Sequence, residues 1–189
     1  MPPPRPSATE VEELLAELTP EVRALTLSVA DAERVVRGLA PVGAECRIAS
    51  SSPHHGRFAG PNRLWFMPGT PAHVSDGTLV VAADRVSVRW AHEGVLKEGE
   101  LVLRGPGAAC RGDFTDTFHA VNPLVLHGHT QGSAVALYCT YPAGDGSPDW
   151  GWRIVLDWYD PDHFSFRMFN VLPDGLEALA VDLRGARAG

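Results

Sequence analysis

A rhythm of short apolar segments, each broken by a turn signal after about 8 to 12 residues, most constrains the fold of this chain. From residue 41 onward these segments are rich in Val, Leu, Trp, Phe and Thr, residue types common in strands. The breaks carry turn-forming residues and lie at 75–77, 83–84, 105–107, 144–146, 160–162 and 173–175. This rhythm is typical of an all-β domain.

The segments predict about ten strands, a count that holds to within one or two. They lie near 44–50, 62–67, 78–82, 85–92, 98–104, 110–118, 124–130, 134–141, 152–159, 164–170 and 177–184. An up-and-down order with short turns favours a closed barrel, because closure removes the exposed sheet edges. The predicted fold class is therefore mainly β, a closed antiparallel β-barrel of about 8 to 10 strands.

The first 40 residues follow a different, helical pattern. Ser7 to Glu10 has the form of a capping box, Thr19-Pro20 restarts a helix, and Gly38 ends a last short turn. Apolar residues recur at helical spacing between these points. The resulting apolar stripe needs a partner, so we expect this N-terminal helical segment to cap one mouth of the barrel.

The chain of 189 residues suits a single folded domain with a proper core. We divide it into a disordered Pro-rich start at 1–6, a helical leader or lid at 7–40, and a β-barrel domain at 41–189. The formal net charge of -7 repels polyphosphate, so no nucleic-acid partner is expected.

The sequence carries neither a signal peptide nor an apolar run long enough for a transmembrane helix. We therefore expect no membrane partner. Cys46, Cys110 and Cys139 are an odd number of cysteines at wide spacing, which favours free thiols over a disulfide framework. Both observations predict a cytoplasmic protein.

Period-2 alternation predicts which side chains point into the barrel. Along residues 85–92, Val86, Val88 and Trp90 share one face, and His92 continues it. The faces carrying Phe164 with Met168, and Trp152 with Trp158, are also apolar. A barrel of this size is either filled by side chains or holds one small ligand, and the sequence leaves both open.

Asp116 shares a strand face with Phe114 and Phe118. An inward carboxylate in an apolar barrel must be hydrogen-bonded, paired or protonated. It is therefore either an internal ion pair, with Arg153 or Arg167, or a general base or orienting acceptor for a substrate.

Tyr138 is either a phenolic donor to a substrate carbonyl or a packed rim residue. The candidate catalytic residues are thus Asp116, Tyr138 and His92. The candidate substrate-binding residues are the aromatic and sulfur side chains of the presumed interior, Trp65, Trp90, Phe114, Phe118, Trp152, Phe166 and Met168.

Other catalytic signatures are absent from the sequence. The histidine pairs at 54–55 and 127–129 have no third ligand nearby, so no metal site is predicted. There is no G-x-S-x-G nucleophile elbow, no P-loop and no G-x-G-x-x-G opening a helix. We therefore expect no cofactor.

Four segments, at 62–69, 116–119, 148–154 and 168–181, resemble uncharacterised bacterial lipocalin-like barrel proteins in the same order along the chain. The resemblance covers about residues 56 to 184 and implies a calycin-type barrel. Two departures are a missing tyrosine in the last strand, where Asp182 to Gly185 stand, and the longer leader. Fold alone implies little about chemistry.

In size and architecture the chain is also similar to small β-barrel cyclases of polyketide pathways, which form spirotetronate or spirotetramate rings by [4+2] cycloaddition. This resemblance implies a cofactor-independent cyclase or isomerase of antibiotic biosynthesis. Such an enzyme holds an apolar substrate in a reactive conformer, and proximity supplies much of its rate.

Two alternatives remain open. A carrier or sensor barrel would bind the same kind of small apolar molecule unchanged, and a heme-binding barrel would require one histidine facing the cavity. The sequence is compatible with either a monomer or a homodimer.

Overall fold

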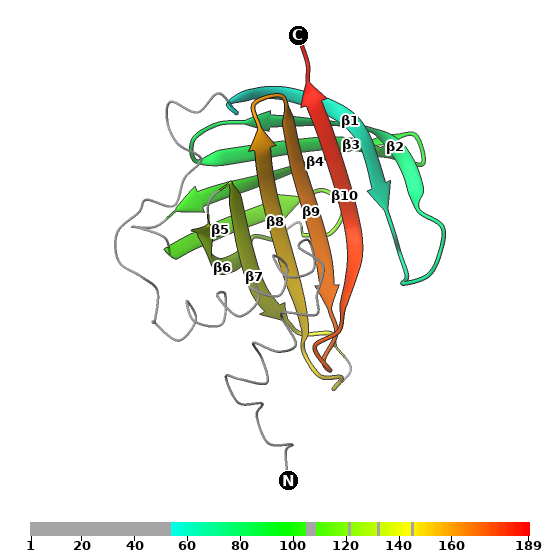
Figure 1. The fold of residues 1–189 in the computed structure, drawn as a ribbon. Coiled ribbons are helices and arrows are strands. Elements are labelled where there is room, and N and C mark those ends of the chain that lie inside the picture. Colours follow the sequence, from blue (N-terminus) through cyan, green and yellow to red (C-terminus); the bar gives the residue numbers. More distant parts are fainter. Residues whose placement is uncertain (1–53, 105–108, 121, 132, 145) are drawn as a thin grey trace, which may run out of the picture.

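The computed structural model describes residues 54–104, 109–120, 122–131, 133–144 and 146–189. These form a closed barrel of antiparallel strands in which each strand pairs with its neighbours in sequence (Figure 1). The strands are β1 Gly56–Leu64, β2 His73–Val81, β3 Arg85–His92, β4 Val95–Arg104, β5 Ala109–Asp116, β6 Leu124–Gln131, β7 Ala134–Tyr141, β8 Trp150–Asp160, β9 His163–Val171 and β10 Glu177–Arg187.

The predicted fold class is confirmed, and the barrel is compatible with a lipocalin-like fold. The strand expected at 44–50 and the helical leader at 7–40 lie outside the described residues, so the division into domains stays a prediction. No helix among the described residues is long and apolar enough to cross a membrane.

The ladder between β1 and β10 closes the barrel. Its register passes from Ala59 opposite Ala186 to Asn62 opposite Leu183. Pro61, which has no N–H to donate, therefore occupies a gap in this ladder. A Cβ at Gly60 would lie 2.1 Å from a backbone oxygen of β10, so the close approach of the strands requires glycine there.

One turn prediction is wrong, and one turn was not predicted. Residues 75–77 lie within β2 rather than in a turn, because Gly77 leaves room for a side chain across the barrel: its Cβ would lie 2.5 Å from Leu183. The tight turn between β3 and β4 is instead at Glu93-Gly94, whose φ angles are 51° and 75°. Positive φ at both central residues is the geometry of a type I′ hairpin.

Aromatic side chains fill most of the barrel interior. Phe58 and Phe164 lie 5.7 Å apart between ring centroids, and Trp158 stacks on Phe164 at 5.9 Å. Phe114 and Phe166 make a second pair at 6.1 Å. These side chains are buried, so the body of the barrel is packed rather than hollow.

The expectation of three free thiols is wrong for Cys110, which is disulfide-bonded. Cys139 is the free cysteine among the described residues. Disulfides persist mainly in oxidising compartments, so the cysteines no longer support a cytoplasmic location. That location stays a prediction.

Packing of the interior can be tested by removing one ring. We expect Phe166→Ala to lower the free energy of unfolding by about 3–5 kcal/mol, because it leaves a cavity in a filled core. Val80→Ala, on the exposed face of β2, should change it by less than about 1 kcal/mol. Urea unfolding measures both. An unchanged stability for Phe166→Ala would contradict the packed interior.

Candidate functional site

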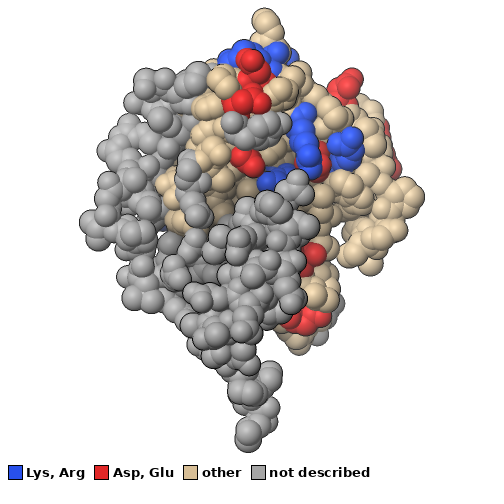
Figure 2. All heavy atoms as spheres, in the orientation of Figure 1, with Lys and Arg blue, Asp and Glu red and all other residues tan. Residues whose placement is uncertain are grey.

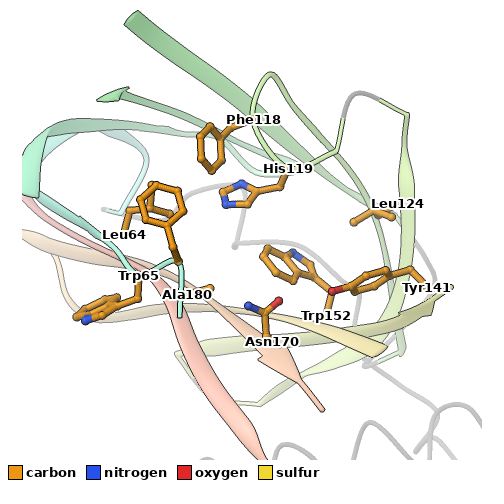
Figure 3. Close-up of a pocket in the computed structure, with 10 residues that line it drawn as sticks. Leu64, Trp65, Phe118, His119, Leu124, Tyr141, Trp152, Asn170 and Ala180 are labelled. Carbon is orange, nitrogen blue, oxygen red and sulfur yellow. The ribbon is translucent and has the colours of Figure 1, made fainter. Parts of the chain in front are cut away.

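A cavity of about 310 Å³ lies at one mouth of the barrel (Figure 3). Its lining residues come from the ends of β1, β7 and β9, the starts of β6, β8 and β10, and the β1–β2 and β5–β6 connections. They are Leu64, Trp65, Phe66, Phe118, His119, Leu124, Tyr141, Trp152, Asn170 and Ala180. The volume is at the lower end of the range for small-molecule sites, about 300–1,000 Å³.

Asp116, the last residue of β5, organises the connection that follows it. Its Oδ1 accepts hydrogen bonds from the backbone N–H groups of Phe118 at 3.0 Å and Ala120 at 2.8 Å, and from that of His119. The Asp116 N–H in turn donates to the carbonyl of Ala120 at 2.8 Å. Aspartate suits this position because its short side chain reaches nearby backbone groups.

The second carboxylate oxygen of Asp116 orients the imidazole of His119. Oδ2 lies 2.6 Å from Nδ1, and the Asp116 side chain is fully buried. An ionised carboxylate only accepts hydrogen bonds, so Nδ1 is the donor in this pair, and in the neutral imidazole the lone pair is on Nε2. Among the described residues, Nε2 has no hydrogen-bond partner. His119 thus offers a basic nitrogen to the cavity that it lines.

The carboxylate of Asp116 is charged at neutral pH. Burial acts to raise the pKa of Asp116, but the hydrogen bond and charge of His119 and the backbone N–H groups outweigh burial, so that this pKa is lowered. The expected Arg153 or Arg167 partner is wrong, because strand alternation places both arginines on the outer face. There Arg153 bonds Glu177 at 2.7 Å and Arg167 lies 3.8 Å from Asp157.

Aromatic rings surround the His119 imidazole. The ring centroids of Phe118, Trp152 and Trp90 lie 4.6, 5.3 and 6.2 Å from that of His119. Such rings restrict the imidazole and lower the local polarity, which strengthens its interaction with Asp116.

Two further polar side chains line the cavity, Tyr141 and Asn170. Burial, and secondly the nearby Cys139, raises the pKa of the Tyr141 phenol, which therefore stays protonated and can donate. Burial raises the pKa of Cys139 to about 11, so this thiol is not a thiolate nucleophile at neutral pH.

Three of the seven predicted substrate-binding residues line the cavity: Trp65, Phe118 and Trp152. Figure 3 shows the Trp65 indole directed away from His119. The other four are buried in the packed interior and do not line the cavity: Trp90, Phe114, Phe166 and Met168.

The structure separates the three predicted catalytic residues. Asp116 does not line the cavity; its carboxylate interacts with Nδ1 of His119, which does line it. His92 lies beside the cavity without lining it, with its ring centroid 5.1 Å from Phe118 and 5.0 Å from His73. Tyr138 lies on the outer face of β7, because the buried Leu137 occupies the inner face.

Sequence reasoning missed Tyr141, Asn170 and His119. The phenol of β7 that reaches the cavity is Tyr141, which shares the inner face with Leu137 and Cys139. The signal for His119 was its place three residues after Asp116 at a strand end. No group of three or more potential metal ligands converges among the described residues.

The sequence matches no protein-family model and no curated protein. The geometry of the Asp116–His119 pair and its cavity is therefore the basis for assigning a function.

The Asp116 carboxylate should contribute pH-dependent stability. Because its folded-state pKa is below the ordinary value of 3.8, its contribution is complete above that value and is lost as the pH falls through the lowered pKa. We expect Asp116→Asn to cost about 1–3 kcal/mol at pH 7 and to flatten the decline in stability as the pH falls below 3.8. Urea unfolding at several pH values measures this.

Asp76→Asn provides the matched control, since Asp76 is an exposed residue of β2. This variant should change neither the stability at pH 7 nor the decline in stability at low pH. A wild-type protein and an Asp116→Asn variant with parallel pH profiles would contradict the role given to Asp116.

Proposed function

We propose that the protein is a cofactor-independent acid–base catalyst of the isomerase or cyclase class, acting on a small apolar molecule in the mouth of the barrel. The observation that carries this proposal is the Asp116–His119 pair, with Nε2 of His119 available to an otherwise largely apolar cavity. A general base must lie within hydrogen-bond reach of the proton that it removes, and His119 lines the cavity in which we place the ligand.

The reaction needs no external reagent. Nε2 of His119 takes a proton from the bound molecule, and the charged imidazolium is stabilised by Asp116. The imidazolium then returns the proton to a different atom of the same molecule, which yields an isomer. If a ring closes first, the proton goes to the atom that carries the negative charge after closure, which yields a cyclised product. Either way the enzyme ends in its starting protonation state.

The rim of the mouth supports an apolar substrate. Phe66 and Met67, from the β1–β2 connection, and Val95 and Leu96, at the β3–β4 hairpin, are exposed large apolar side chains. Figure 2 shows the β1–β2 connection, at the right of the view, without acidic or basic side chains. Exposed apolar groups beside a cavity are a common feature of ligand-binding sites.

The narrower proposal is an intramolecular cyclisation in polyketide biosynthesis. It draws on the resemblance in size and architecture to β-barrel cyclases. If that cyclisation is a [4+2] cycloaddition, it moves no proton, and the cavity then acts by holding the reacting ends together rather than through His119 as a base. A cavity of about 310 Å³ favours a compact substrate over a long polyketide chain, so we place the substrate among small apolar molecules.

The alternative from another class is a carrier or sensor barrel. It would use the same apolar cavity and rim, but it would not require an oriented imidazole. In the heme-binding alternative, His119 would be the iron ligand. A Soret band after addition of hemin to the full chain would favour that alternative.

The proposed base can be tested with 5-nitrobenzisoxazole, a compact apolar probe. Removal of its C3 proton breaks the N–O bond and releases a coloured phenolate. We expect His119→Gln to lower the rate by about 100-fold or more, the usual contribution of a positioned base. Absorbance measures the phenolate. His127→Gln, an exposed histidine of β6, should leave the rate unchanged.

Equal rates for wild-type protein and His119→Gln would contradict the catalytic proposal. If the probe also binds both proteins with equal affinity, the carrier alternative would be favoured.

A further inference from the structure

The indole of Trp152 has a buried N–H group that finds no hydrogen-bond partner among the described residues. Trp152 is 6% exposed, yet it lines the cavity. Figure 3 places its nitrogen on the ring edge turned toward His119 and Leu124. Leaving a buried donor unpaired costs about 1–3 kcal/mol, so such a group in a native structure calls for an explanation.

A purely structural explanation fits Trp90 better than Trp152. The Nε1 of Trp90 is also buried and has no partner in the described part of the chain, but Trp90 belongs to the packed interior and does not line the cavity. Trp152 differs because a bound molecule can approach it. Its orphan N–H is therefore a donor that a ligand can satisfy.

The sheet register places a second donor beside the first. Asn170 of β9 lies directly opposite Trp152 of β8, and directly opposite residues share one face of a sheet. Both side chains line the cavity. The Asn170 amide can donate as well as accept, so this residue offers the cavity a second neutral donor.

The base lies close to these donors. The ring centroids of His119 and Trp152 are 5.3 Å apart, with 46° between the ring planes. One small molecule can therefore present a C–H group to Nε2 of His119 and an oxygen atom to the Trp152 N–H. A carbonyl compound with a hydrogen on the adjacent carbon has this arrangement.

We propose that the substrate is an enolisable ketone or related neutral carbonyl compound, with Trp152 and Asn170 donating hydrogen bonds to its oxygen. This inference rests on the proposed function, because it assumes that His119 is the base. Nε2 takes the α-proton, the C–H electrons form the C=C bond, and the C=O π electrons move to oxygen. The resulting enolate is held by donors whose interaction strengthens as charge develops.

The enolate has two productive fates. Where a C=C bond adjoins the α-carbon, the enolate is a dienolate, and return of the proton from the imidazolium to its γ-carbon moves the double bond and gives an isomer. Attack of the α-carbon on a second carbonyl of the same molecule gives a ring, and the imidazolium proton then neutralises the new alkoxide. Both routes conserve atoms and charge.

The cavity lining favours a neutral substrate over a carboxylate or a phosphate. No Lys or Arg is among the lining residues in the part of the chain that the structure describes. Lys97 lies outside this set, with Nζ 5.6 Å from the centroid of the Phe118 ring. An anionic substrate would lack a direct partner and would meet the charged Asp116 nearby.

The test uses 2-tetralone, a compact bicyclic ketone, and tetralin, the same ring system without the oxygen. Exchange of the α-hydrogens of 2-tetralone in D2O is followed by NMR with the full-length protein. We expect Trp152→Phe to slow exchange by about 100-fold, the usual effect of removing one donor to a developing oxyanion. Trp158→Phe, at a tryptophan of the packed interior that does not line the cavity, should slow it less than about threefold.

Binding provides a second readout. Wild-type protein should bind 2-tetralone about tenfold more tightly than tetralin, as one net hydrogen bond predicts, and Trp152→Phe should reduce this ratio toward one. Unchanged exchange and an unchanged ratio in Trp152→Phe would overturn the carbonyl assignment, as would a wild-type protein that neither exchanges 2-tetralone nor prefers it.

His119→Gln separates this inference from the proposed function. If His119→Gln abolishes exchange but Trp152→Phe does not, the base is supported and the donor is wrong. If His119→Gln exchanges 2-tetralone as fast as the wild-type protein, the proposed function itself fails.

Discussion

Hydrogen bonding between β1 and β10 joins residues 58–64 to residues 181–187 and turns a meander of strands into a barrel. Without this ladder, both strands would be exposed edges, and the inward side chains would face solvent. Closure depends on glycine at two points. A Cβ at Gly60 would meet the backbone of β10, and one at Gly185 would lie 2.7 Å from Phe58. The packed interior and its cavity follow from a ring of strands that is closed tightly here.

The closed barrel has two regions of different character. Aromatic rings fill its body, whereas polar side chains occur at the mouth that carries the β5–β6 connection. The buried Asp116 carboxylate is tolerated because its own connection supplies the hydrogen bonds that it needs. No arginine has to enter the barrel to compensate its charge, so the space in front of His119 remains available to a ligand.

The sequence predicted the features that depend on local periodicity. Alternation along residues 85–92 placed Val86, Val88 and Trp90 inside, and turn residues at 160–162 and 173–175 separated real strands. Prediction from the sequence failed where a glycine allows close packing rather than a turn, as at Gly77. It also failed where both faces of a strand carry apolar residues. In β7 the alanines share a face with Tyr138, and this concealed the inward role of Tyr141.

The site itself was less predictable, because it is assembled from residues that are distant in sequence. The Asp116 carboxylate was recognised as unusual, but its partner depends on the path of residues 116–120, which periodicity does not describe. The unpaired indole N–H of Trp152 is a property of the packed structure, and Trp152 in sequence looks like any other core tryptophan.

His119, the proposed base, lies on a connection rather than on a strand, so the proposed reactive group is separate from the strands of the barrel. The barrel wall is fixed by registers that tolerate little change, whereas residues 117–120 take part in no strand ladder. A lineage of such proteins can therefore exchange the reactive group by altering a few neighbouring codons, while the barrel remains the same. The same property makes this mouth a natural site for grafting new chemistry by protein engineering.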